Sequence, residues 1–228
     1  MNIKKLAAEK AVDWVEEGMM VGLGTGSTAA YAIEKIGERV KQGLHIRAVA
    51  TSVQSENLAR EWSIPIIPFA EVGEIDLTID GADEVDPNLN LIKGGGGALL
   101  REKIVAARSR QVMIITGENK VVQKLGAFPL PVEVVTFAHE WTIEKLASFG
   151  CKPVLRQTKD GDVFKTDNGN YTVDCHFDVI EDAARLHHQL NNIPGVVDNG
   201  LFINMASAVV VAYESGVIEV LRAPARRS

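Results

Sequence analysis

Short apolar runs alternate with amphipathic stretches through the first half of the chain. Apolar runs typical of buried strands lie at 19–23, 46–51, 65–69, 75–79 and 112–116, and helical spacing of apolar residues appears at 4–17, 29–41, 54–62 and 98–108. This alternation predicts an α/β domain, with a Rossmann-like, mostly parallel sheet and helices on both faces. Ligands of such sheets bind beyond the carboxyl ends of the strands, so the segments that follow the strands are the first candidates for a site.

The rhythm changes after the sequence FPLP at 128–131. Strands are predicted at 132–135, 153–157, 171–176 and 200–204, and helices at 138–149 and 181–190. The order β-α-β-β-α-β is that of a ferredoxin-like α+β unit, and the sequence DNGN at 167–170 suits a hairpin turn. We therefore predict a smaller domain at 129–204. Residues 1–128 and 205–228 then form the Rossmann-like catalytic domain, to which β-rich runs at 208–213 and 217–221 return.

A glycine-rich turn at 22–28 joins the first predicted strand to a helix. Glycines let the backbone approach a ligand closely, and the first N–H groups of a helix favour an anion. Candidate contacts to a sugar phosphate are Thr25, Gly26, Ser27 and Thr28. A dinucleotide site and a purely structural turn are the alternatives. The strand at 46–51 ends in Thr51-Ser52 and not in the acid that would bind a nucleotide ribose, which weighs against the dinucleotide site.

An acidic segment, Asp80–Asp86, directly follows the apolar strand at 75–79. Acids at the carboxyl end of a strand face the ligand crevice of an open sheet, so Asp80, Gly81, Ala82 and Asp83 are candidate site residues. A solvated acidic loop and a metal site are the alternatives, since clustered carboxylates attract hard cations. The segment lacks the regular ligand spacing of an EF-hand.

Lys93 precedes four successive glycines, Gly94–Gly97, and a helix follows them. Ordering so many glycines costs conformational entropy, so we expect this backbone to crowd a ligand or to flex. The pattern is not a Walker A loop, because the lysine stands before the glycines; a flexible linker is the alternative.

Glu102 lies in the helix that follows these glycines. It stands roughly 200° around the helix from Leu100, so it is predicted to point away from an apolar face of Leu100, Ile104 and Ala107, toward solvent or a cleft. A glutamate near a helix N-terminus is held ionised by the helix dipole, which suits a base. Lys120, after the strand at 112–116, is a weaker candidate, and Lys4 and Lys5 are weaker still.

Composition narrows the classes of function. The 228 residues carry a formal net charge of −6, which argues against a nucleic-acid-binding surface. No apolar run is long enough for a membrane span, and the N-terminus lacks the core of a signal peptide. Cys151 and Cys175 are far apart in the sequence and near no cluster of histidines or cysteines, which predicts neither a disulfide framework nor a zinc site and fits a reducing cytoplasm.

Seven motifs in order resemble the A-type ribose-5-phosphate isomerases. They are GTGSTAA at 24–30, DGADE at 80–84, KGGGGAL at 93–99, REKI at 101–104, FPLPVEV at 128–134, TDNGN at 166–170 and IPGVV at 193–197. The likeness spans nearly the whole chain apart from its C-terminal tail. Each motif is weak by itself, whereas seven in this order are specific.

The resemblance implies an enzyme that interconverts D-ribose 5-phosphate and D-ribulose 5-phosphate in the non-oxidative pentose phosphate pathway, without a metal or organic cofactor. It implies a homodimer or homotetramer that binds a small-molecule sugar phosphate; the composition predicts a cytoplasmic protein with neither nucleic acid nor a membrane as a partner. The catalytic base of the family falls on Glu102, beside the further catalytic candidates Asp80, Asp83 and Lys93. The substrate loops fall on Thr25–Thr28, Asp80–Asp83 and Lys93–Gly96 (Lys93, Gly94, Gly95 and Gly96), with Lys120 as a further contact.

Two rival functions belong to other classes. A non-catalytic sugar-phosphate sensor would need the phosphate loop but not Glu102 and Lys93, and would normally carry a DNA-binding appendage. An enzyme similar to the acyl-CoA transferases would need a glutamate nucleophile in another context and a larger chain. Neither fits this sequence as well as an isomerase.

Overall fold

The computed structural model describes residues 2–222. The chain folds into two compact units: Met1–Ala82 with Arg101–Val121 and Asn204–Ser228, and Asp83–Leu100 with Val122–Ile203. The predicted boundaries, 1–128 with 205–228 against 129–204, differ from this division at 83–100, at 122–128 and at Asn204. In the chain, the division falls once inside the acidic segment, after Ala82, and once inside a helix, after Leu100.

The first unit is built on a six-stranded sheet. Its order is β13 (Ile218–Arg222), β12 (Ala208–Ala212), β6 (Ser109–Gly117), β3 (Ile75–Gly81), β1 (Met20–Leu23) and β2 (Arg47–Ala50). All neighbours pair in parallel except β13, which is antiparallel to β12. The strands other than the edge strand β13 are buried along most of their length, as expected for a parallel sheet covered on both faces.

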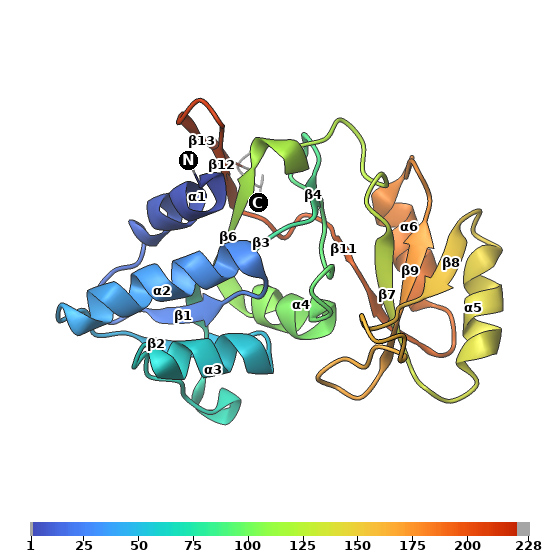
Figure 1. The fold of residues 1–228 in the computed structure, drawn as a ribbon, viewed down its shortest axis with the longest axis horizontal. Coiled ribbons are helices and arrows are strands. Elements are labelled where there is room, and N and C mark those ends of the chain that lie inside the picture. Colours follow the sequence, from blue (N-terminus) through green and yellow to red (C-terminus); the bar gives the residue numbers. More distant parts are fainter. Residues whose placement is uncertain (1, 223–228) are drawn as a thin grey trace. The chain divides into compact units, whose positions relative to one another are not determined.

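Helices cover both faces of this sheet (Figure 1). On one face, the core joins α1 (Ile3–Val12), α2 (Ser27–Lys41) and α3 (Val53–Glu61) to the strands. On the other, Val105 of α4 (Leu99–Ala107) packs with Met20, Val49 and Ile75. Two short 3-10 turns, Phe69–Glu71 and Glu118–Lys120, complete the unit. The predicted Rossmann-like α/β fold class is confirmed.

The second unit contains a four-stranded antiparallel sheet in the order β10 (Val196–Asn199), β7 (Leu130–Val134), β9 (Tyr171–His176) and β8 (Lys152–Leu155). The helices α5 (His139–Ala147) and α6 (Ala183–Asn191) pack on one face, where Val132, Val134 and Val173 point. Glu133 and Thr172 alternate with these residues and therefore point to the opposite face. A small sheet joins β11 (Leu201–Phe202), β5 (Leu91–Ile92) and β4 (Glu84–Val85).

Two predicted strands are wrong. Residues 65–69 form only an isolated bridge between Ile66 and Ala48, because Pro65 and Pro68 bring no N–H group to a ladder. The last strand of the ferredoxin-like unit is β10 at Val196–Asn199 and not 200–204, whose residues Leu201–Phe202 pair instead with β5. Among residues 2–222, no helix is long and apolar enough to cross a membrane.

Candidate active site

The glycine turn after β1 is tied to the end of β3. The Thr25 N–H donates to Oδ1 of Asp80 at 3.0 Å, and the Gly81 N–H donates to the same oxygen at 2.7 Å. A Cβ atom added to Gly24 would lie 2.2 Å from that oxygen, so only glycine allows the two segments to come this close. The turn and Asp80 are thus one local structure at the carboxyl edge of the parallel sheet.

The side chain of Thr25 faces inward. Its Oγ1 is hydrogen-bonded to Thr51 Oγ1 at 2.7 Å and to Ser52 Oγ at 2.9 Å, and Ser55 Oγ donates to the Gly24 carbonyl at 2.7 Å. Thr25 is only 8% exposed. Thr51 and Ser52, which follow β2, therefore hold the glycine turn through the Thr25 side chain. The part of Thr25 in the candidate site is to fix the backbone of this turn.

The N-terminus of α2 is the predicted anion-binding feature of the first unit. Gly26 is the N-cap of this 15-residue helix, with a φ of +102°, and as a glycine it has no side chain to accept from the first N–H groups. The Lys4 ammonium donates to Ser27 Oγ at 2.9 Å, which places a cation at the same helix end. Gly26 and Ser27 are exposed and Thr28 is half-buried, so a phosphate can reach these donors.

The strand ends next to this turn supply further candidates. Asp80 ends the buried part of β3 and is 2% exposed, while Gly81 and Ala82 are half-buried. Lys120 lies in the 3-10 turn that directly follows β6, the parallel neighbour of β3. Topology therefore brings Asp80 and Lys120 to the carboxyl edge that also carries the α2 N-terminus.

Glu102 lies in the first turn of α4, on the side of the helix away from Leu100, Ile104 and Ala107, as predicted; the prediction that these three residues form the buried apolar face is wrong, because Ile104 and Ala107 are exposed. The side chain is 3% exposed and shares its helix face with the buried residues Leu99 and Val105, whereas Ile104 is 58% exposed. A buried carboxylate is costly unless local charge and hydrogen bonds stabilise it, and the positive end of α4 supplies part of that stabilisation. Burial removes the solvent-exposed alternative for this glutamate.

The second unit contains Asp83, Lys93 and the glycines. Oδ2 of Asp83 accepts from the Gly95 N–H at 2.8 Å, and the Gly97 N–H donates to the Gly94 carbonyl at 2.9 Å, which closes a tight turn. Lys93 is 3% exposed, and its ammonium lies 5.4 Å from the ring centroid of Phe202. The four glycines form a defined turn rather than a linker.

Other acids of the segment support the backbone. Glu84 is 3% exposed and accepts from the N–H groups of Gly126 at 2.7 Å and Phe128 at 2.6 Å. Asp86 accepts from the N–H groups of Asn88 and Asn90, both at 2.8 Å. Among the described residues, no group of three or more His, Cys, Asp or Glu side chains is arranged to hold a metal ion.

Sequence reasoning missed the residues that hold the glycine turn. Arg156 donates to the carbonyl oxygens of Gly94 at 3.0 Å and Gly95 at 3.3 Å, and a Cβ atom on Gly97 would lie 2.4 Å from Phe164. Both residues come from the segment between β8 and β9, before the TDNGN motif at 166–170. One available signal was a basic residue in an otherwise apolar strand followed, 18 positions later, by the acid Asp174 in the next strand.

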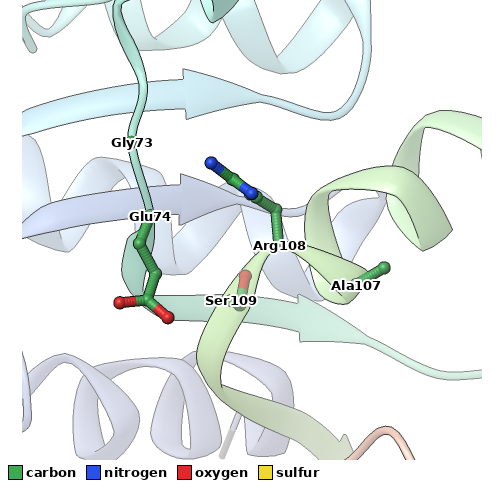
Figure 2. A pocket seen from close by; sticks show the side chains of 5 residues that line it. All are labelled: Gly73, Glu74, Ala107, Arg108 and Ser109. Atoms are coloured by element: carbon green, nitrogen blue, oxygen red, sulfur yellow. The ribbon is translucent and has the colours of Figure 1, made fainter.

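A pocket of about 280 Å³ lies elsewhere in the first unit (Figure 2). It is lined by Gly73, Glu74, Ala107, Arg108 and Ser109. These residues precede β3 or stand where α4 meets β6, at the amino-terminal edge of the sheet. The pocket is therefore at the opposite end of the strands from Asp80, and it contains none of the candidate site residues.

Comparisons with known proteins agree on one family. The family model described as "Ribose 5-phosphate isomerase A (phosphoriboisomerase A)" matches residues 47–216. A ribose-5-phosphate isomerase A of Bacillus mycoides is 50% identical over 220 residues, which cover 96% of this chain and 99% of the relative. One of Listeria monocytogenes is 45% identical and covers 97% and 99% of the two chains.

Solved structures give the same result. A D-ribose-5-phosphate isomerase in complex with phospho-erythronic acid has a TM-score of 0.94 at 43% identity, covering 97% of this chain and 100% of the other. A ribose 5-phosphate isomerase A of Methanocaldococcus jannaschii has a TM-score of 0.91 at 40% identity, covering 96% and 98%.

Proposed function

The chain belongs to the ribose 5-phosphate isomerase A family of aldose–ketose isomerases, which interconvert ribose 5-phosphate and ribulose 5-phosphate, and we propose that Glu102 is the base of this reaction. The observation that supports this most directly is its setting: a 3%-exposed carboxylate in the first turn of a helix that follows a glycine-rich turn. The reaction moves a proton between C2 and C1 of the open-chain sugar. A single carboxylate near both carbons removes the proton from one and returns it to the other.

The intermediate is an enediolate, so negative charge develops on the sugar oxygens. In this proposal the buried Lys93 and N–H groups of the Gly94–Gly96 turn stabilise that charge. The Gly95 N–H already donates to Asp83, so it acts by holding the turn and not by contacting the sugar. Asp80 and Asp83 hold sugar hydroxyl groups and move protons between O1 and O2.

The phosphate binds at the N-terminus of α2. Ser27, Thr28 and the backbone of Gly26 supply donors, Lys4 adds a positive charge through its contact with Ser27, and Lys120 is a further cation after β6. A related chain, 43% identical, binds phospho-erythronic acid, which combines a phosphate with a carboxylate. That pair of anionic groups is the one an enediolate phosphate presents, which supports one phosphate subsite and one oxyanion subsite here.

The test is Glu102→Gln, which keeps the size of the side chain but removes the base. A positioned base contributes about 10²- to 10⁴-fold to turnover, so kcat should fall by that factor while the variant still binds phospho-erythronic acid. Glu38→Gln, which changes a half-buried glutamate of α2 paired with Lys35, is the matched control. Incorporation of solvent deuterium into the product reports the proton transfer directly. Near-normal turnover by Glu102→Gln would refute the role of this residue.

Measuring the conversion of ribose 5-phosphate to ribulose 5-phosphate also distinguishes the isomerase from two rival functions. A sensor binds ribose 5-phosphate without converting it, and an acyl-CoA-transferase-like enzyme acts on a CoA thioester and not on the sugar. We further propose that the enzyme needs no metal or organic cofactor and is a cytoplasmic homodimer or homotetramer. Activity that survives a chelator tests the first point, and light scattering of the purified protein tests the assembly.

A further inference from the structure

The turn Gly94–Gly97 is flexible by composition and yet is held at several atoms. Gly94 has a φ of +104° and Gly97 a φ of +80°, conformations that glycine adopts readily. Four successive glycines also allow their peptide planes to rotate with little steric penalty. Whatever fixes these planes decides whether an N–H or a carbonyl group faces a ligand.

Arg156 fixes two of these peptide planes. Its Nη1 donates to the carbonyl oxygen of Gly94 at 3.0 Å and to that of Gly95 at 3.3 Å. The first peptide unit is held at both ends, because the Gly95 N–H donates to Asp83 at 2.8 Å. All these residues belong to the second unit, so the arrangement is internal to it.

The peptide unit between Gly95 and Gly96 is held by Arg156 at its carbonyl end alone. In a planar trans peptide the C=O and N–H bonds point in opposite directions. When Arg156 holds the Gly95 carbonyl, the Gly96 N–H must therefore point away from the guanidinium. Gly96 is exposed, and its N–H donates no hydrogen bond within residues 2–222. It is a donor held in a fixed direction and open to a ligand.

The guanidinium is itself held in place. Asp174 accepts from Nε at 2.9 Å and from Nη2 at 2.5 Å, a paired geometry that only arginine can make. The side chains are 14% and 22% exposed, which limits the screening of this ion pair by water. Phe164 lies 5.7 Å from the guanidinium and packs against Gly97. Asp174 and Phe164 leave Nη1 directed at the glycine carbonyls.

We propose that Arg156 is a positioning residue, which directs the Gly96 N–H toward an oxygen of the enediolate by holding the carbonyls of Gly94 and Gly95. This inference rests on the proposed function. It gives Arg156 no contact with the sugar: its effect passes through the orientation of one peptide. Without Arg156 the Gly95–Gly96 peptide is free to rotate, and it then presents a carbonyl oxygen where negative charge develops.

The test compares Arg156→Met and Arg156→Lys with the parent protein. Removing one oriented hydrogen-bond donor from such a site lowers kcat by about 10²- to 10³-fold. A peptide that is free to rotate still presents its N–H part of the time, so kcat of Arg156→Met should fall by only about 10- to 100-fold. KM for ribose 5-phosphate should stay within about threefold, because the phosphate subsite is untouched. Arg156→Lys keeps the charge but not the fork and should lose nearly as much as Arg156→Met.

Arg110→Met is the matched control, since it also removes an arginine paired with carboxylates, Glu74 and Asp76, but on an exposed surface. It should leave kcat unchanged. Millimolar guanidinium ion should restore part of the kcat of Arg156→Ala and none of that of Glu102→Gln. A kcat for Arg156→Lys within about twofold of the parent, or a loss confined to KM, would overturn the proposal.

Amide hydrogen exchange separates this inference from the proposed function. In protein labelled with ¹⁵N-glycine, the N–H groups of Gly95 and Gly97 should exchange faster in Arg156→Lys than in the parent, because their turn is released. The exchange rates are measured without turnover, so they test the role of Arg156 in the turn even if the enzyme acts on a different sugar. Unchanged exchange at both glycines would show that Arg156 does not fix the turn.

Discussion

The carboxylate of Asp80 and the backbone N–H of Thr25 are joined by a 3.0 Å hydrogen bond across 55 positions of sequence. Together with the Gly81 N–H on the same oxygen, this bond fixes the Asp80 side chain at the carboxyl edge of the sheet. The turn that leads to the proposed phosphate site and the strand end that carries a proposed catalytic acid therefore cannot move independently. A disturbance of either should affect both binding and turnover.

Gly24→Ala tests this coupling. The added methyl carbon would lie 2.2 Å from Oδ1 and 2.5 Å from Cα of Asp80, so the backbone itself must shift. We expect the free energy of unfolding to fall by about 1–3 kcal/mol, because the added methyl group overpacks this region. We also expect kcat/KM to fall at least about tenfold, because the shift displaces both the glycine turn and Asp80. Gly73→Ala is the control, since a methyl group added at Gly73 would have no other atom within 4 Å. Urea unfolding and steady-state kinetics measure both, and full activity in Gly24→Ala would contradict the coupling.

Lys4→Met tests the phosphate site. A hydrogen bond to a charged group contributes about 1.5–3 kcal/mol, so its loss should raise KM for the sugar phosphate by about tenfold or more and leave kcat nearly unchanged. The dependence of KM on salt should weaken as well, because one screened charge is gone. Lys5→Met is the control: Lys5 is exposed and pairs with Glu9 at 3.8 Å. An equal rise in KM for both variants would show a diffuse charge effect rather than a site.

The sequence predicted which residues stand at the ends of the parallel strands better than it predicted which face of α4 is buried. The location of Asp80 and the glycine turn followed from a general rule about parallel sheets, which holds whatever the side chains do. The burial of Glu102 did not follow from the sequence, because the apolar Ile104 is 58% exposed and its hydrophobicity marked the wrong face of the helix as the buried one. Helical periodicity identifies the buried face only when the apolar residues are those that are buried.

Arg156 shows the other limit of sequence reasoning. It contacts glycines more than 60 positions earlier in the chain, and these contacts use backbone carbonyls, which leave no trace in residue type. The last strand of the second unit was misplaced for a similar reason. Pairing depends on which edge is available, and a two-residue strand such as β11 or β4 has no period to detect.

The two cysteines should differ in reactivity. A hydrogen bond from the Cys175 thiol lowers the pKa of Cys151, whereas the same contact and burial raise the pKa of Cys175. Cys151 is half-buried and Cys175 is buried. Because the thiolate is the nucleophile, one thiol should react with iodoacetamide in the native protein, with a midpoint of its rate–pH profile below that of a free cysteine, and two should react after unfolding.

Cys151→Ser is the control for this assignment and should abolish the native reaction. In Cys175→Ser, the rate–pH profile of Cys151 should change, since the hydrogen-bonding partner is altered. Native labelling at Cys175, read by peptide mass spectrometry, would contradict the predicted order.

Glu133 is a buried carboxylate, 0% exposed, that organises the hairpin between β8 and β9. Its Oε1 accepts from Thr166 Oγ1 at 3.0 Å, Asn168 Nδ2 at 3.1 Å and Asn170 Nδ2 at 2.8 Å. Within the described chain, Glu133 Oε2 and the hydroxyl of Thr172, its direct neighbour across β7 and β9, have no hydrogen-bond partner. Oε1 thus accepts all three hydrogen bonds that hold the hairpin, whereas the burial of Oε2 without a partner costs desolvation energy.

Glu133→Leu and Glu133→Gln should therefore differ sharply. Leucine removes the acceptor shared by three buried or half-buried donors, which should lower the free energy of unfolding by about 2–5 kcal/mol. Glutamine keeps an acceptor oxygen and places an amide donor opposite the Thr172 hydroxyl, so its effect should stay within about 1 kcal/mol. Urea unfolding of both variants measures the difference. Equal destabilisation would mean that the negative charge, and not the acceptor, holds the hairpin; equal stability would mean that the hairpin does not depend on Glu133.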